Sequence, residues 1–313
     1  MHTQRLGSSQ HDIEKAAEIL AKGGLVAFPT ETVFGLGADA SDDFAVAKIY
    51  EAKGRPSFNP LIVHVSDVGM AKRLVEWNDQ ADHLARAFWP GPLTLVLPMR
   101  TDAGVSKLVS AGLPTVAIRV PRHPIAQSML RAFGGPVAAP SANLSGKISP
   151  TRADHVLNGL DGRIDAIFTE GHSENGVEST ILHFDPNPTI LRPGTITAAD
   201  ISSVLGQPVA RLEHADNIIA PGQMTSHYAP RAAVRLDAKD WHAGEKRLGF
   251  GDVTCDLNLS PTGDLVEAAA NLFDMLHQID DMDGDRIAVS PIPNHGIGIA
   301  INDRLSRAAA PRD

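Results

Sequence analysis

Polar and apolar positions alternate with two different periods through the first two-thirds of the chain. Residues 12–24 repeat apolar side chains at the helical spacing, start at a capping candidate, Asp12, and end in two glycines, so they predict a helix. "LVAF" follows as a strand. "PLIVHV", at residues 60–65, is a continuous apolar run, which is typical of a strand buried on both faces. Helical and extended segments therefore alternate, and the pattern predicts an α/β domain.

Short connections between several predicted strands indicate the type of sheet. In "ESTILHFDPNPTILRPG" two strand patterns are separated by only a few turn-forming residues. Parallel neighbours need a longer crossover, so this pair is antiparallel and the sheet is mixed. The expected fold is a twisted mixed sheet with flanking helices, whose polar loops form a concave basic crevice.

The pattern changes after Gly206. Residues 207–230 carry Pro and Gly without a sustained helical period, and we expect them to form an interdomain linker. Residues 231–313 alternate again and predict a smaller, Rossmann-like α/β domain. Its helix around residues 264–279 places six apolar side chains on one face, at Leu265, Ala269, Leu272, Phe273, Leu276 and Ile279. The predicted domains are thus residues 1–206 and 231–313.

Length and composition agree with two globular domains. The chain has 313 residues, about twice the ~150 residues of a typical domain, with 43% hydrophobic and 21% charged residues. It contains no run of about 18 apolar residues and starts without a secretory signal, so we expect a cytoplasmic protein. Its one cysteine, Cys255, allows neither an internal disulfide nor a Cys-x-x-Cys site.

The net charge of -9 argues against a protein that coats nucleic acid through a general basic surface. Cations nevertheless recur in loops rich in Pro and Gly, where an anionic small molecule can bind, or where they are simply solvated. These cations are Lys53, Arg55, Arg119, Arg122, Lys147, Arg152 and Arg192.

Common catalytic signatures are missing. Gly146-Lys147 lacks the spacing of a P-loop, and in "GLGADA" the segment "PTETVF" separates the strand from the first glycine, unlike a dinucleotide fold. Ser141 follows a strand but is not in a G-x-S-x-G elbow, and no zinc-binding histidine motif is present. What remains is a set of seven polar loops at strand ends, which supply cations, hydroxyls and amides without an evident nucleophile. Such a set predicts a crevice that positions anionic reactants.

Four of these stretches, "PTETVFGLG", "KGRPSFNPL", "SANLSG" and "GVESTI" with "LRPG", resemble the motifs of the threonylcarbamoyl-AMP synthase (YrdC-like) family. The order and spacing are kept over about residues 10–205, and "APGQMTSHYAP" with the tail resembles the linker and second domain of the longer variant of that family. The resemblance implies that L-threonine, bicarbonate and ATP give threonylcarbamoyl-AMP and pyrophosphate. It places this reaction before a tRNA threonylcarbamoyl-transfer machinery, with at most a weak direct contact to tRNA.

The resemblance also implies roles for individual residues. Lys53 and Arg55 should meet the phosphates, and Mg²⁺ should arrive with the triphosphate. The nucleotide site would comprise Arg55, Asn59, Thr115, Ser141, Ser149, Arg192 and Tyr228. The threonine site would comprise Thr32, His64, Arg119, Ala139 and Ser179. Arg119 is the natural partner for the threonine carboxylate, and Tyr228 would close over the nucleotide as a lid.

One position departs from the family pattern. The loop usually reads "PTETVYG", and Phe34 keeps the ring but lacks the hydroxyl, so a packing role survives and a hydroxyl role does not. Two other classes of function stay open at this point: an RNA-binding module with a basic concave surface, and a hydrolase that uses Ser141.

Overall fold

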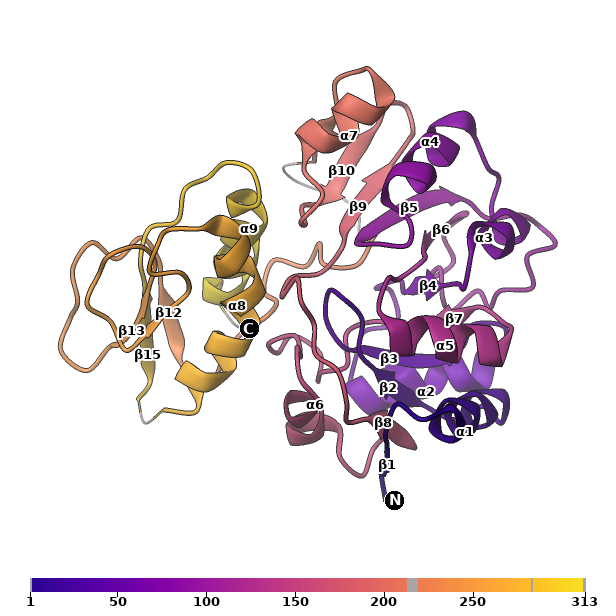
Figure 1. The fold of residues 1–313 in the computed structure, drawn as a ribbon, viewed down its shortest axis with the longest axis horizontal. Coiled ribbons are helices and arrows are strands. Elements are labelled where there is room, and N and C mark those ends of the chain that lie inside the picture. The colour runs from indigo at the N-terminus through magenta and orange to yellow at the C-terminus, as the bar shows by residue number, and fades with distance from the viewer. Residues whose placement is uncertain (1, 213–218, 283, 312–313) are drawn as a thin grey trace.

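The computed structural model describes residues 2–212, 219–282 and 284–311. Two α/β units lie side by side, a large N-terminal one and a smaller C-terminal one (Figure 1). The expected architecture of a twisted mixed sheet with flanking helices and a smaller α/β domain is confirmed. No helix of the described ranges is both long and apolar enough to span a membrane.

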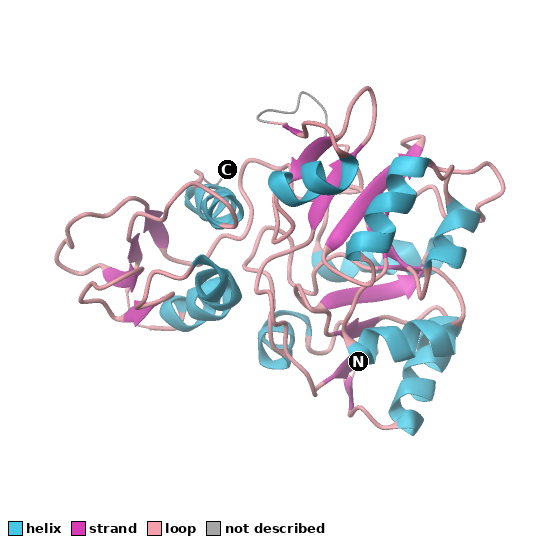
Figure 2. Ribbon diagram, turned by 45° about the horizontal axis from the view of Figure 1, so that its top comes forward, coloured by secondary structure: helices cyan, strands magenta, loops and turns pink. Residues whose placement is uncertain are grey.

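The large unit contains an eleven-stranded sheet in the order β1-β8-β2-β3-β7-β4-β6-β5-β9-β10-β11. Its strands are β1 (Gln4–Leu6), β2 (Val26–Phe28), β3 (Gly35–Asp39), β4 (Ile62–His64), β5 (Leu93–Pro98), β6 (Thr115–Arg119), β7 (Val137–Ala138), β8 (Ala166–Phe168), β9 (Thr180–His183), β10 (Thr189–Arg192) and β11 (Ala210–Arg211). Its helices are α1 (Gln10–Ala21), α2 (Asp43–Lys53), α3 (Val68–Leu74), α4 (Asp79–Phe88), α5 (Pro124–Phe133), α6 (Ala153–Leu160) and α7 (Ala198–Leu205). Most of these helices flank the sheet at the periphery of the large unit (Figure 2).

Two parallel strands at the centre of this sheet carry polar residues at their carboxyl ends. β4 and β6 pair in parallel, with His64 opposite Arg119. β5 is antiparallel to β6 and parallel to β9, and β10 is antiparallel to β9. The start of β9 and the end of β10 therefore lie on the same edge as His64 and Arg119. This mixed topology brings loops from four strands together.

The apolar pattern explains the packing of the helices. α1 buries Ile13, Ala16 and Leu20 against α5 and the sheet. Its first residue differs from the sequence prediction, because Ser9 rather than Asp12 is the N-cap. The Ser9 hydroxyl accepts a hydrogen bond from the Asp12 backbone amide at 3.2 Å. Because Ser9 caps the helix, α1 begins at Gln10, before the predicted start.

The C-terminal unit has a four-stranded parallel sheet in the order β12-β15-β13-β14. The strands are β12 (Ala233–Arg235), β13 (Lys246–Gly249), β14 (Leu257–Asn258) and β15 (Arg286–Val289), and the helices are α8 (Leu265–Asp280) and α9 (Gly298–Ala309). The apolar face predicted for α8 is confirmed, with Leu272, Phe273 and Leu276 fully buried. α8 and α9 lie between the small sheet and the large unit (Figure 1).

The segment expected to be a linker is partly built into the large unit. Residues 210–211 form β11, which pairs in parallel with β10 at the sheet edge. Residues 213–218 lie outside the described residues. Further along, Tyr228 is almost fully buried, which a flexible tether would not require.

The two units are in close contact. Gly176, with a φ of +68°, touches the second unit so tightly that a Cβ atom there would lie 2.2 Å from the Ala269 carbonyl oxygen. The rings of His155 and His277 stack across the same boundary with centroids 3.9 Å apart.

Candidate active site

A pocket opens at the edge where β4, β6, β9 and β10 meet. It is lined by Thr30, Thr32, Val33, Gly35, Arg55, Ile62, His64, Arg119, Ala139, Pro140, Ser141, Glu178, Arg192, Pro221, Gly222, His227 and Tyr228. Eight residues expected at the nucleotide or threonine site are among them: Thr32, Arg55, His64, Arg119, Ala139, Ser141, Arg192 and Tyr228.

The turn between β2 and β3 supplies two threonines and a glutamate. Thr30 folds the turn by accepting hydrogen bonds from the Thr32 and Val33 amides at 3.2 and 3.3 Å. Arg119 donates from Nη1 to the Thr32 hydroxyl at 2.9 Å, and its Nη2 lies 2.7 Å from Glu31. Burial alone would raise the pKa of Glu31, but the charge and hydrogen bond of Arg119 lower it, so the carboxylate stays ionised. The turn thus fixes the guanidinium at the pocket wall.

His64 is an uncharged polar group beside this guanidinium. Burial, helped by the nearby Arg119 charge, lowers its pKa to about 3. Its Nδ1 has no hydrogen-bond partner among the described residues. Because the ring is neutral, it can hydrogen-bond to a bound molecule through its free nitrogen without competing with Arg119 for an anion.

Arg55 follows α2 and its C-cap residue Gly54, which has the left-handed conformation with a φ of 60°. The Asn59 and Pro60 carbonyls accept hydrogen bonds from the Arg55 Nε and Nη2 at 3.2 and 2.9 Å. Burial lowers its pKa to about 10, with Arg192 adding to the effect, and the group remains charged at neutral pH. Its loop therefore presents a fixed positive charge to the pocket.

Lys53 does not line the pocket but lies directly behind it. Its buried ammonium donates to the Ser141 carbonyl at 2.6 Å and also to the Asn143 carbonyl. Burial, together with the Arg55 charge, lowers the pKa of Lys53 well below its usual range. Lys53 thus holds the loop that carries Ser141.

The start of β9 and the end of β10 contribute a network of polar side chains. Arg192 donates from Nε to the Ser179 carbonyl and from Nη2 to its hydroxyl, both at 3.1 Å. Ser179 in turn hydrogen-bonds to Thr94 at 2.7 Å. The Ser149 hydroxyl donates to Glu178 at 2.5 Å. Ser149 and Ser179 therefore support the pocket from behind rather than lining it.

His227 and Tyr228 of the linker close one side of the pocket. Their rings pack edge to face with centroids 4.0 Å apart. Tyr228 has a φ of +61°, an uncommon conformation for a residue other than glycine. Its ring packs against the buried ring of Phe273, with the two centroids 5.3 Å apart. Burial raises the pKa of Tyr228 to about 12, and burial lowers that of His227 to about 3, so both are neutral.

Besides Ser149, two more expected nucleotide residues, Thr115 and Asn59, do not line the pocket. Thr115 begins β6 and Arg119 ends it, which puts them about 13 Å apart at ~3.3 Å per residue. Asn59 is buried and donates to the Met224 sulfur at 3.4 Å. Phe34, where the family usually has Tyr, is fully buried in the main core.

Four residues at or beside the pocket carry no role in the sequence prediction: Glu31, Glu178, His227 and Arg304. Glu31 and Glu178 stand inside the quoted stretches "PTETVFG" and "ESTI", and His227 directly precedes Tyr228, so their neighbours carried a signal. Arg304 had none. It reaches the site only because α9 of the second unit packs against it.

The pocket is thus lined by three buried guanidiniums, two neutral imidazoles and several hydroxyls. Across the described ranges no histidine or carboxylate hydrogen-bonds to the Ser141 hydroxyl, so the site is not arranged as a serine nucleophile with a base. The same ranges contain no group of three or more His, Cys, Asp or Glu side chains suited to a shared metal ion. The fold and this pocket define an α/β protein whose buried cations and hydroxyls suit an anionic small molecule.

Comparison with known proteins identifies the class more closely. Residues 18–194 match the sequence family Sua5/YciO/YrdC, described as telomere recombination, and residues 196–310 match the C-terminal domain of threonylcarbamoyl-AMP synthase. The chain is 42% identical to threonylcarbamoyl-AMP synthase of Bacillus subtilis (strain 168), with 99% of this chain and 96% of that protein aligned. It is 40% identical to the Pyrococcus abyssi protein of the same name, over 96% and 94%.

A solved structure of P. abyssi Sua5 in complex with L-threonine has a TM-score of 0.90 to this chain. The two are 37% identical, and the alignment covers 99% of this chain and 98% of that one. The chain belongs to the threonylcarbamoyl-AMP synthase family. It is an enzyme of the nucleotidyltransferase type.

Proposed function

We propose that this pocket joins L-threonine, bicarbonate and ATP into threonylcarbamoyl-AMP and releases pyrophosphate. The observation that carries the proposal is the convergence of Arg55, Arg119 and Arg192 on one pocket in a chain whose net charge is -9. Three guanidiniums buried together are costly unless anions compensate them. A carboxylate and a triphosphate are two such anions.

Threonine binds beside the turn between β2 and β3. Arg119 receives the carboxylate, because its orientation is already fixed by Glu31 and Thr32. Neutral His64 and the Ala139 region border the same end of the pocket, and Ser179 supports it from behind. P. abyssi Sua5, the structural relative described above, holds this amino acid.

ATP occupies the end formed by Arg55, Ser141, Arg192 and Tyr228. Arg55 and Arg192 contact the phosphates, while Lys53 holds the Ser141 loop from behind. Ser149 and Asn59 stabilise this wall without lining it. Among the described residues that line the pocket, the one carboxylate, Glu178, is already paired, so these residues do not suit an all-protein Mg²⁺ site. Mg²⁺ enters as part of the MgATP substrate.

The chemistry needs no nucleophile from the protein. The threonine amine and bicarbonate form a carbamate with loss of water. A carbamate oxygen then attacks the α-phosphorus, and pyrophosphate leaves. The enzyme contributes alignment of the two substrates, positive charge at the phosphates and exclusion of water by His227 and Tyr228.

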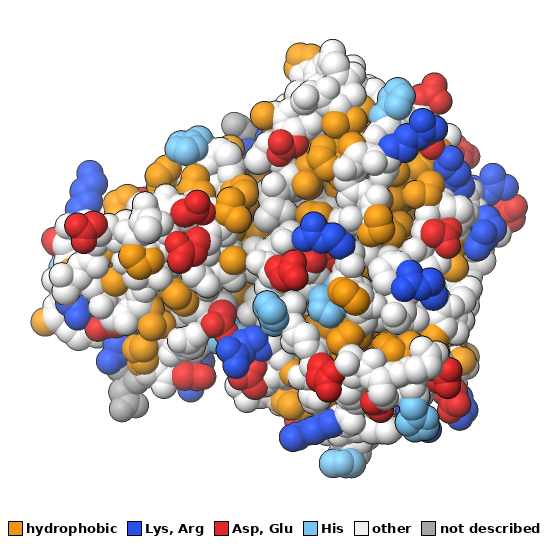
Figure 3. Space-filling model, viewed as in Figure 1, with side chains coloured by type: hydrophobic (Ala, Val, Ile, Leu, Met, Phe, Trp, Pro, Cys, Tyr) orange, Lys and Arg blue, Asp and Glu red, His pale blue; other side chains and the backbone are white. Residues whose placement is uncertain are grey.

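The product is a mixed anhydride and hydrolyses readily, so it must pass quickly to an acceptor. We propose that a cytoplasmic tRNA threonylcarbamoyl-transfer machinery consumes it. A basic RNA-docking surface is a weaker alternative: Lys and Arg side chains are interspersed with Asp and Glu on the face seen in Figure 3.

Pyrophosphate release, measured with one substrate omitted at a time, tests this function. Release is expected only when threonine, bicarbonate and MgATP are all present. Release that continues without threonine or without bicarbonate would identify a different ATP-cleaving activity. Turnover of an ester without ATP would favour a hydrolase.

A further inference from the structure

Arg304 of α9 reaches from the second unit to the wall of the pocket. Its side chain is 0% exposed, and its Nε donates to the Glu178 carboxylate at 2.7 Å. Its guanidinium also lies over the Tyr228 ring, 5.4 Å from the centroid. Arg304 thus touches both a pocket carboxylate and the proposed lid.

Glu178 makes this contact important, because a carboxylate is out of place beside a triphosphate site. It lines the same pocket as Arg55 and Arg192. An unpaired Glu178 would repel the phosphates, and it would also compete with them for the Arg192 guanidinium. The Arg304 guanidinium offsets that charge, and the Ser149 hydrogen bond stabilises the ionised carboxylate.

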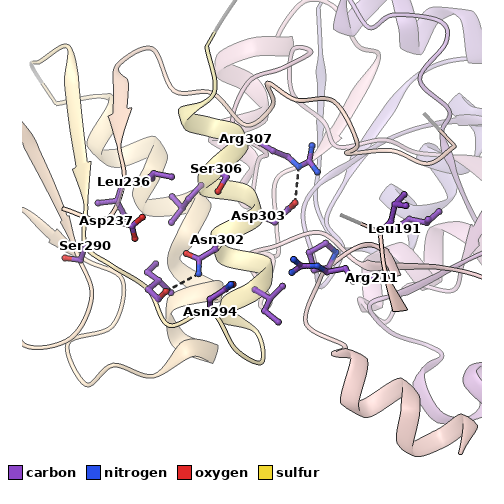
Figure 4. A pocket seen from close by; sticks show the side chains of 16 residues that line it. Leu191, Arg211, Leu236, Asp237, Ser290, Asn294, Asn302, Asp303, Ser306 and Arg307 are labelled. Carbon is purple, nitrogen blue, oxygen red and sulfur yellow. Dashed lines mark hydrogen bonds and ion pairs between the residues drawn. The ribbon is translucent and has the colours of Figure 1, made fainter. Parts of the chain in front are cut away.

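α9 holds the linker as well. The Arg307 side chain donates to the Met224 carbonyl, and the Arg307 carbonyl accepts from the His227 amide at 3.2 Å. Asp303 fixes both arginines: it lies 2.6 Å from Arg304 and 3.1 Å from Arg307. Figure 4 shows Asp303 and Arg307 on α9 at the groove between the two units, joined by this ion pair.

We propose that the C-terminal domain is an integral part of the ATP site, and that Arg304 is its positioning residue: it neutralises Glu178 and holds Tyr228 over the nucleotide. The domain therefore acts on nucleotide binding and not as a separate module. This inference rests on the proposed function, since Arg304 is assigned a role at the end of the pocket where ATP is proposed to bind.

The charge argument predicts a specific kinetic signature. Arg304→Met leaves the Glu178 carboxylate buried and unpaired, so KM for ATP should rise by about 30-fold or more, the usual cost of breaking a buried charge pair at a binding site. KM for threonine should change much less, because Arg119 and Thr32 do not contact Arg304. Arg304→Lys keeps the charge and should retain most of the ATP affinity.

A second substitution separates charge from packing. In Arg304→Met/Glu178→Gln no carboxylate is left unpaired, so ATP affinity should recover towards the wild-type value. If Arg304 only supported the fold, the double variant would be no better than the single one. Arg247→Met is the matched control, because it removes another arginine–carboxylate pair of the same domain, 3.0 Å to Asp256, on β13. Its kinetics should match those of wild type.

The experiment measures ATP affinity by calorimetry and both KM values by pyrophosphate release for the full-length chain and each variant, with thermal unfolding as the folding check. Should Arg304→Met not fold, Arg304→Gln keeps a donor to Glu178 without the charge and should show the same rise in KM. A folded Arg304→Met or Arg304→Gln with wild-type KM for ATP, or a double variant as weak as the single, overturns the inference. A wild-type chain that neither binds ATP nor releases pyrophosphate would instead refute the proposed function.

Discussion

The Arg119 guanidinium lies 2.7 Å from the Glu31 carboxylate, and the two side chains are only 4% and 2% exposed. Glu31 is itself anchored, because its other oxygen accepts from the Arg122 amide at 3.0 Å. The pair therefore holds a cation rigidly at the pocket wall before any substrate arrives. Such preorganisation lowers the entropic cost of binding.

Replacing Arg119 tests its role as the carboxylate partner. Arg119→Lys keeps the charge but loses the planar fork, so KM for threonine should rise at least about tenfold, or ~1.4 kcal/mol, with a smaller effect on KM for ATP. Arg122→Lys, three residues further along the chain and with an exposed side chain, is the control and should behave as wild type. Equal effects on both KM values would remove Arg119 from the threonine site.

Glu31 makes a pH-dependent contribution to stability. Arg119 lowers the pKa of Glu31 in the folded state below its ordinary value of 4.5. The ionised pair therefore stabilises the fold above pH 4.5, and this stabilisation is lost as the pH falls towards the lowered pKa. Glu31→Gln should reduce the free energy of unfolding by about 3–5 kcal/mol at neutral pH. The gap to wild type should narrow as the pH falls below about 4.5 in urea titrations, whereas a gap independent of pH would contradict the account.

Lys53 and Arg55 are two residues apart, yet substituting them should affect different properties, stability for Lys53 and ATP binding for Arg55. Lys53→Met leaves the Ser141 and Asn143 carbonyls without their donor, at about 1–3 kcal/mol for each buried group. It should mainly lower the urea midpoint. Arg55→Met removes a charge that lines the pocket and should mainly weaken ATP binding. A stable Lys53→Met variant that has lost ATP binding would move Lys53 into direct contact with the phosphates.

The fold could be predicted well because its signals are local. Continuous apolar strands, the α8 face and short strand connections each determine nearby structure. The pocket was predicted in part, since its loops stand at strand ends. Lys53 and Thr115 show the limit: a position near a motif does not reveal whether a side chain faces the ligand. Arg304 shows another, because contact between distant units depends on tertiary packing, and no sequence spacing encodes it.

Tyr228 is expected to shield the nucleotide through its ring. Tyr228→Phe keeps the packing against Phe273 and His227, so a small effect is expected if only the ring matters. Tyr228→Ala opens the pocket wall, which should weaken ATP binding and raise free AMP relative to threonylcarbamoyl-AMP as water reaches the anhydride. Rapid-quench chromatography measures this product ratio. A wild-type ratio in Tyr228→Ala would show that the linker does not act as a lid.

The most direct test of the central claim follows the carbon of bicarbonate. Wild-type enzyme is incubated with threonine, MgATP and ¹³C-labelled bicarbonate, and the products are separated and their masses are measured by mass spectrometry. The account predicts labelled threonylcarbamoyl-AMP, formed in equal amount with pyrophosphate and absent when threonine is left out. Pyrophosphate released together with an adenylate that carries no label would contradict it.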